Sequence, residues 1–279
     1  MTDSAADPPT VREVVAALDA RYPHAWAEPW DRVGLVLGEF DLPVRTVLGV
    51  VDVVPETVEQ AVEAGADLIV AHHPLLLKGV SSVAPDTYKG RIVHRLIKAD
   101  VALYVAHTNA DVAHPGVSDA LADRLGLTML RPLVDHGEGR GIGRVGELAT
   151  PLSLAALTDF VAARLPSTSA GVRAAGDPAR TIRTLAVSGG AGDSFLRAAK
   201  EAGADAYLCA DLRHHPASEH VAAGGPALID VAHWASERPW LDEVAGWLRA
   251  QFGVTVVVSD LDTDPWTVHS VSIDKENHP

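Results

Sequence analysis

The fold is decided by one short stretch, Leu68-Ile69-Val70-Ala71-His72-His73-Pro74. Its four consecutive apolar residues are typical of a short buried strand. Similar apolar runs recur along the chain, at 46–51, 101–106, 181–187, 206–210, 227–231 and 254–258. Segments with helical periodicity separate several of them, for example 55–62 and 117–125. Apolar strands that alternate with helices predict an α/β fold in which mainly parallel strands are covered by helices.

An internal repeat indicates how the fold is organised. The pentapeptide 63–67, Glu-Ala-Gly-Ala-Asp, recurs at 201–205, and both copies are followed by a His-His-Pro, at 72–74 and 214–216. Ala- and Gly-rich helix ends are common, so coincidence is one interpretation. The shared order of strand, helix, pentapeptide and histidines favours the other, which is two related α/β lobes that face each other.

The length of the chain agrees with two lobes. At about 150 residues per domain, 279 residues correspond to about two domain-sized units. A segment rich in Gly and charge, 135–143, is expected to be a loop near the boundary. We therefore predict a first lobe over 1–135 and a second over 136–225, with part of the C-terminal segment 226–279 packed against the first.

The composition excludes several classes of function. Lys and Arg number 23 against 37 Asp and Glu, a formal net charge of −14, so neither broad nucleic-acid binding nor attachment to an anionic membrane is expected. No apolar run approaches the ~18 residues of a membrane span, and residues 1–9 lack the features of a secretory signal. The single cysteine, Cys209, lies in an apolar run; it excludes a disulfide framework and favours a cytoplasmic location.

Side chains that bind metal ions follow three of the predicted strands. In open α/β sheets, ligands bind at the carboxyl ends of strands. A histidine pair alone could lie on a surface loop, and an aspartate alone could be a turn residue. Three strand ends with such residues make a metal site the better interpretation. These residues are His72 and His73, then His107 and Asp111, and finally His233 and Glu237.

The number of these residues favours two ions rather than one. A catalytic zinc ion commonly has three protein ligands. Three histidines and two carboxylates are too many for one ion; they are His72, His73, His233, Asp111 and Glu237. They suit a pair of ions bridged by a carboxylate. His233 and Glu237 are four residues apart and would share one face of a helical turn. Imidazoles with carboxylates suit Zn, Mn, Fe, Co or Ni, and paired ions activate water for hydrolysis. We expect the five ligating groups to converge.

A Gly-rich segment, 188–192, precedes a helix predicted from about residue 195. It has neither the lysine nor the spacing of a P-loop. Two interpretations stay open. It is either a plain tight turn or a loop that holds an anion or substrate on its backbone N–H groups.

Six blocks of sequence carry a family resemblance. In chain order they are Trp30–Leu35, Ala71–Pro74, His107–Asp111, Ser188–Ser194, Asp211–His215 and His233–Glu237. Together they resemble the Nif-three-like dinuclear metal-centre family, also called the GTP cyclohydrolase 1 type 2 family, in its short form without an inserted domain. The resemblance extends from about Val11 to Phe252.

The resemblance implies a fold, an assembly and a ligand set. It implies two α/β lobes with a pair of metal ions in the cleft between them, and a ring-shaped homohexamer. Glu237 would bridge the two ions. The ligands that it implies are His72, His73, Asp111, His233 and Glu237.

Further roles follow from the resemblance for residues around the ligands. His107 and His215 would line the site, as supports of the ligands or as proton carriers, and Asp31 would lie at the rim of the cleft. The sequence departs from the family pattern at Arg32, at residues 209–211 and at residues 238–240. Arg32 stands where Asn is frequent, and Trp240 lies where small residues are common, so both could reshape the cleft and alter the choice of substrate.

Two functional hypotheses result. In the first, the protein is a metal-dependent hydrolase of the GTP cyclohydrolase 1 type 2 kind that acts on a nucleotide or a related small molecule. In the second, it is a non-enzymatic metal-binding scaffold or regulatory protein that acts through partners. The motifs themselves indicate a dinuclear metal site more strongly than they indicate GTP.

Overall fold

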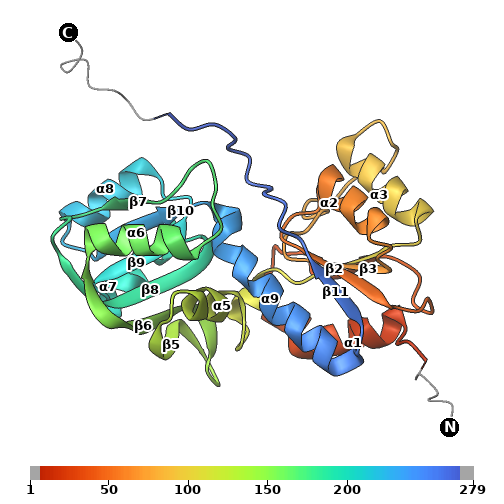
Figure 1. Cartoon of the computed structure of the whole chain (residues 1–279), viewed down its shortest axis with the longest axis horizontal. Helices are drawn as coiled ribbons and strands as arrows, with labels where there is room; N and C mark the ends of the chain where they lie inside the picture. Colours follow the sequence, from red (N-terminus) through yellow and green to blue (C-terminus); the bar gives the residue numbers. More distant parts are fainter. Residues whose placement is uncertain (1–6, 271–279) are drawn as a thin grey trace.

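The computed structural model describes residues 7–270, which form two α/β lobes (Figure 1). The first lobe is built on a five-stranded sheet of order β1-β4-β3-β2-β11. Every neighbouring pair in this sheet is parallel except β1 and β4. The strands are β1 (Gly34–Leu37), β2 (Thr46–Val50), β3 (Leu68–Ala71), β4 (Ala102–Val105) and β11 (Thr255–Val258).

Helices cover both faces of this first sheet. Alternate residues of a strand point to opposite faces. Leu68 and Val70 of β3 accordingly pack with α1 (Val11–Arg21) and α9 (His233–Phe252). Ile69 and Ala71 pack on the other face with α2 (Pro55–Glu63) and α3 (Tyr88–Lys98). Burial on both faces explains why these strands are continuously apolar.

The second lobe contains a six-stranded sheet of order β5-β6-β8-β9-β10-β7. Of its neighbouring strand pairs, only β8 with β9 and β9 with β10 are parallel. One face packs against α5 and α6, and the other against α7 and α8. The elements are α5 (Val117–Arg124), β5 (Thr128–Gly137), β6 (Arg140–Ser153), α6 (Leu154–Arg164), β7 (Arg173–Ala175), β8 (Thr181–Ala191), α7 (Leu196–Glu201), β9 (Ala206–Ala210), α8 (His214–Ala222) and β10 (Ala227–Val231).

The prediction of two α/β lobes is confirmed, and mainly parallel strands are found in the first sheet but not in the second. The segment 135–143 was expected to be a loop, yet it is the tip of the antiparallel hairpin of β5 and β6. Glu138 and Gly139 join the strands with φ of 57° and 75°, as in the two-residue turns that match strand twist. Most of β5 is exposed, so it lacks the apolar alternation by which a half-buried strand is recognised.

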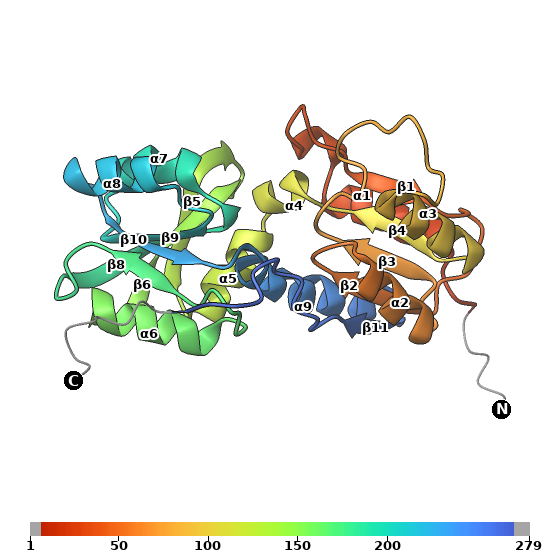
Figure 2. The same cartoon turned by 90° about the horizontal axis from the view of Figure 1, so that it is seen from above.

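The course of the chain between the sheets also differs from the expected 1–135 and 136–225 division. The chain enters the second sheet at β5, and β10, inside the segment 226–279, belongs to that sheet as well. The chain then returns to the first lobe through α9 and β11. Figure 2 shows α9 running between the lobes, together with α4 (Thr108–Val112) and α5.

The Gly-rich segment is not a simple turn. Residues 188–191 continue β8, with a register shift against β9 between Val187 and Ala191. A 3-10 turn, η2 (Asp193–Phe195), then leads into α7. This irregular strand end reaches α9, where the backbone N–H of Gly190 donates to Ser236 Oγ at 2.8 Å.

The internal repeat has the same structural role in both lobes. Asp67 Oδ2 accepts hydrogen bonds from two successive backbone N–H groups at the start of β2, at 2.7 and 2.9 Å. Asp205 Oδ2 does the same at the start of β8, at 2.8 and 3.0 Å. Gly65 and Gly203 end the preceding helices with φ of 62° and 74°, which glycine adopts without steric cost. The repeated pentapeptides therefore fasten a strand-helix-strand unit in each lobe.

None of the helices within residues 7–270 combines the length and the apolar character that crossing a membrane requires.

Candidate metal centre

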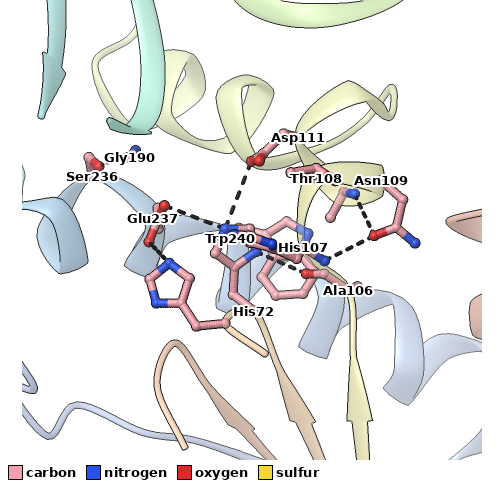
Figure 3. A network of polar contacts seen from close by, with 12 residues as sticks. His72, Ala106, His107, Thr108, Asn109, Asp111, Gly190, Ser236, Glu237 and Trp240 are labelled. Carbon is pink, nitrogen blue, oxygen red and sulfur yellow. Dashed lines mark hydrogen bonds and ion pairs between the residues drawn. The ribbon is translucent and has the colours of Figure 1, made fainter. Parts of the chain in front are cut away.

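The predicted metal ligands lie where three strands end, between the lobes. His72 and His73 directly follow β3 in the first lobe. Asp111 lies on α4, just beyond β4, while β10 of the second lobe leads into α9, whose first turn carries His233 and Glu237. Figure 3 shows Asp111 and Glu237 directed from these two helices toward the ring of His72.

The carboxylate of Glu237 is the centre of this cluster. Its Oε1 atom lies 3.0 Å from His233 Nε2 and 3.4 Å from His72 Nε2, and its Oε2 atom lies 3.1 Å from His73 Nε2. Asp111 Oδ1 is 3.8 Å from His72 Nε2. Each of the five predicted ligands thus lies within 3.8 Å of another, and their role as metal ligands stays a prediction.

Each histidine of the cluster is held through its Nδ1 atom, which leaves its Nε2 atom for the centre. A partner on the second nitrogen fixes the orientation of an imidazole ligand and raises its basicity. The acceptors are the backbone oxygen of Ala106 for His72 (2.9 Å), Asp52 for His73 (2.8 Å), Asp31 for His107 (2.9 Å) and Asp211 for His233 (2.7 Å).

Charge interactions dominate the protonation of the cluster. Burial would lower the pKa of His73, but Glu237 and Asp52 outweigh it and raise this pKa to about 10. Burial would also lower the pKa of His233, but Glu237 and Asp211 outweigh it and raise this pKa to about 11. Burial, and then the charge of Glu237, raises the pKa of Asp111 to about 7. Glu237 itself has a pKa well below its usual range, because the surrounding histidines outweigh the effect of its burial.

Three observations show that the cluster fits metal ions. First, its donors are imidazoles and carboxylates, which divalent transition metals prefer. Second, His72 Nε2 and Glu237 Oε2 are buried and have no hydrogen-bond partner within residues 7–270, and buried polar atoms of this kind call for a partner such as a metal ion. Third, a Cβ at Gly190, where φ is +67°, would lie 2.5 Å from Glu237 Oε1 and 3.0 Å from His233 Nε2, so only glycine leaves the centre open.

His107 lies within the cluster. It caps α4, its ring centroid is 5.2 Å from that of His72, and Nε2 or Nδ1 atoms of His72, His73 and His107 lie within 4.8 Å of one another. His73, His233 and Glu237 form a second such group. The described part of the chain therefore offers two overlapping sets of ligand atoms, which share His73.

His215 is placed differently. It lies in the exposed first turn of α8, with its ring 5.1 Å from that of His214. Among the described residues, it forms no hydrogen bond or ion pair with the cluster. The structure thus brings His107 to the ligands and leaves His215 on the surface of the second lobe, and the role expected of His215 stays a prediction.

Three further residues differ from what the resemblance implies. Asp31 is not at a rim: its side chain is fully buried and accepts hydrogen bonds from His107 and Thr108. Arg32 bonds to the backbone oxygen of Asp31 beside it. Trp240 is fully buried behind His72, with ring centroids 5.4 Å apart, and donates from Nε1 to the hydroxyl of Tyr22. Trp240 therefore packs against a predicted ligand and does not line an open surface.

Asp52 is the functional residue that sequence reasoning missed, and the pairing of Asp211 with His233 was not foreseen. Both residues follow strands, β2 and β9, near their carboxyl ends. The rule that ligands bind at the carboxyl ends of strands, which identified His72, also applies to Asp52 and Asp211. Aspartate is so common after strands, however, that the position alone does not separate a supporting carboxylate from an ordinary turn residue.

Comparison with known proteins places this geometry in context. Residues 9–265 match the family model described as Duf34/NIF3 (NGG1p interacting factor 3). A "GTP cyclohydrolase 1 type 2 homolog" of Streptomyces coelicolor is 54% identical over 275 residues, covering 95% of this chain and 96% of the relative. The Mycobacterium tuberculosis protein of that name is 36% identical, over 92% of this chain and 96% of its own. The crystal structure of Staphylococcus aureus protein SA1388 superposes with a TM-score of 0.87 at 27% identity, over 94% of this chain and 100% of that one.

The mycobacterial alignment runs over 366 positions, more than the 279 residues of this chain. That relative therefore carries additional residues, as expected if this chain is a short form.

Proposed function

The chain belongs to the Duf34/NIF3 family, and from this membership and the site we propose that it is a metal-dependent hydrolase of the GTP cyclohydrolase 1 type 2 kind. It acts on a nucleotide or a related small molecule. Two divalent ions, of Zn, Mn, Fe, Co or Ni, bind between the lobes. The residues that would hold them are His72, His73, Asp111, His233 and Glu237, of which Glu237 would be shared by the two ions.

One observation carries this proposal. Three imidazoles and two carboxylates that follow three strand ends converge, and two of their buried atoms, His72 Nε2 and Glu237 Oε2, have no hydrogen bond among the described residues. Leaving such groups unsatisfied costs about 1–3 kcal/mol each, a cost that bound ions remove. When bound, a pair of divalent ions polarises the scissile group and activates water.

The protein groups around the ions have separate tasks. Asp52 and Asp211 hold His73 and His233 in place through Nδ1. His107 keeps Nε2 free while its Nδ1 bonds to Asp31, so it can accept a proton at Nε2 during the reaction. Burial would raise the pKa of Asp31, but hydrogen bonds from His107 and Thr108 hold it well below the usual range. Asp31 thus stays a carboxylate and stabilises the protonated ring.

The test couples metal content with turnover. Glu237→Gln is expected to lose bound metal and hydrolysis of GTP, related nucleotides or phosphoesters together. Asp242→Asn, an exposed position of the same helix, should change neither. Elemental analysis and a substrate screen on the same samples check this. Full metal occupancy in Glu237→Gln, or no turnover of any of these substrates by fully loaded wild-type protein, would contradict the proposal.

A second candidate function is a non-enzymatic metal-binding scaffold or regulatory protein. The description of the family as an interacting factor favours it. A scaffold keeps its partner binding when His72→Ala and Glu237→Ala abolish metal binding. Affinity capture of the same partners by wild-type protein and by both variants, without any hydrolytic activity, would support this alternative over the hydrolase.

We also propose that the protein is a homohexamer, as the family resemblance implies. Light scattering coupled to size-exclusion chromatography should then give six times the 29.4 kDa of the chain. A mass of one or two chains at micromolar concentration would exclude it.

A further inference from the structure

A cavity of about 750 Å³ opens beside the metal centre, a volume within the range of small-molecule sites. His73 and His233 form its inner end. One wall comes from the junction of β10 and α9, including Trp234, and from the loop before β7. The opposite wall is the C-terminal segment from Thr263 to His269.

That C-terminal segment leaves β11 in the first lobe and crosses toward the second (Figure 1, blue). Ser259 Oγ donates to Gln60 Oε1 at 2.7 Å, and Thr263 Oγ1 donates to Asp52. Asp52 is the carboxylate that orients His73. The segment is therefore fastened both to the first lobe and to the support of a proposed metal ligand.

Trp266 is held in position although its side chain is open to solvent. Its backbone N–H donates to Asp264 Oδ1 at 2.9 Å, and the N–H of Asp264 donates to Asp262 Oδ1 at 2.9 Å. Two successive turns of this kind fix the backbone locally. Even so, Trp266 stays 69% exposed and lines the cavity, so the fold presents an aromatic face without covering it.

Away from the metal centre, the charges of the cavity disfavour a polyanion. Apart from the histidines, the described lining residues carry one guanidinium, that of Arg173, and four carboxylates, those of Asp52, Asp211, Asp230 and Asp264. Arg173 already pairs with Asp230, with Nε and Oδ2 2.7 Å apart. A triphosphate tail that extended away from the metal centre along this cavity would meet these four carboxylates, and the one guanidinium among the described lining residues is already paired. Carboxylates can instead accept hydrogen bonds from ring N–H or amino groups.

We infer that this cavity binds a planar, nitrogen-containing ring without a polyphosphate tail, which stacks on Trp266 and reaches the metal centre at His73 and His233. The inference rests on the proposed function and narrows its substrate to the nucleoside or free-heterocycle class. Trp266 acts as a specificity-determining residue for that class.

The experiment is equilibrium dialysis of guanosine, adenosine and GTP with metal-loaded protein of measured metal content. We expect at least one nucleoside to bind wild-type protein, and GTP to bind no more tightly than guanosine. Trp266→Ala should weaken nucleoside binding about tenfold, as loss of one stacking face does, while Trp266→Phe keeps most of it. Met129→Ala, an exposed apolar side chain on β5 of the second lobe, is the matched control and should bind like wild type.

Three results would overturn the inference: neither nucleoside binds, Trp266→Ala binds as wild type does, or GTP binds more than tenfold more tightly than guanosine. Turnover measured on the same samples separates this inference from the proposed function. Nucleoside binding that depends on Trp266, without turnover of any substrate, would support the inference and contradict the proposed hydrolase function. Turnover that is the same in wild-type protein and in Trp266→Ala would support the proposed hydrolase function and contradict the inference.

Discussion

The two lobes share a strand-helix-strand unit and use its end differently. In the first lobe, β3 leads directly into His72 and His73, whose Nε2 atoms face Glu237 at 3.4 and 3.1 Å. In the second, β9 leads into Asp211, which holds His233 at 2.7 Å, and the His-His-Pro follows only at the exposed start of α8. One repeat therefore supplies ligands and the other supplies support for a ligand. A shared scaffold does not fix which of its side chains reach a site.

The strongest test compares the histidines of the two His-His-Pro motifs. His72→Ala removes a fully buried group of the cluster, and metal affinity should fall more than the ~10–100-fold typical of losing an outer partner. His215→Ala should leave affinity unchanged, because His215 is exposed and apart from the cluster. Metal titration with a competing chelator measures both. Equal losses in the two variants would remove the distinction between the lobes and restore a site role for His215.

The supporting carboxylates should have smaller effects. Asp52→Asn and Asp211→Asn each leave the metal ligands in place but weaken the hold on His73 or His233, so affinity should fall about 10–100-fold. The Asp52 side chain is 27% exposed and that of Asp211 is 58% exposed, so the loss at Asp52 should be the larger. The same chelator competition ranks the two. An unchanged metal affinity in both variants would mean that the hydrogen bonds of these aspartates to Nδ1 do not orient the rings of His73 and His233.

The pH dependence of metal binding should involve two histidines, His73 after β3 and His233 at the start of α9. In the metal-free protein His73 has a pKa of about 10 and His233 of about 11, so both are protonated at pH 7. An ion can bind only after they lose these protons. Affinity should therefore rise with pH between 6 and 8, by up to about tenfold per unit for each proton released. Calorimetry in two buffers of different ionisation enthalpy counts these protons, and a count of zero would contradict the assignment.

The smallest expected effect concerns the repeat itself. Asp67→Ala and Asp205→Ala each remove a carboxylate that accepts two backbone hydrogen bonds. Each should lower the free energy of unfolding by about 1–2 kcal/mol, since bonds to charged groups are worth about 1.5–3 kcal/mol when sheltered and less when exposed. Urea unfolding should show similar and additive losses, because the sites lie in separate lobes. Strongly unequal losses would show that the repeats are not equivalent.

Some local features of the site could be predicted from the sequence, whereas contacts between distant segments could not. His233 and Glu237 lie on one turn of α9 as their spacing predicts, because helical geometry is local. The hairpin of β5 and β6 could not be predicted, because β5 is largely exposed and carries little apolar signal. The close approach of Gly190 to Glu237 could not be predicted from the sequence either, because it is a contact between segments far apart in the chain.

Helix α9 joins the metal centre to the folding of the first lobe. Glu237 lies in its first two turns, while Trp240, Leu241, Val244 and Leu248 farther along are buried in the core of the first lobe. The backbone at Glu237 therefore cannot move away from the centre unless that core is unpacked. The conformational entropy of ordering this carboxylate is thus lost when the lobe folds and not when ions bind. The centre is preorganised, and its affinity should depend little on the flexibility of this ligand.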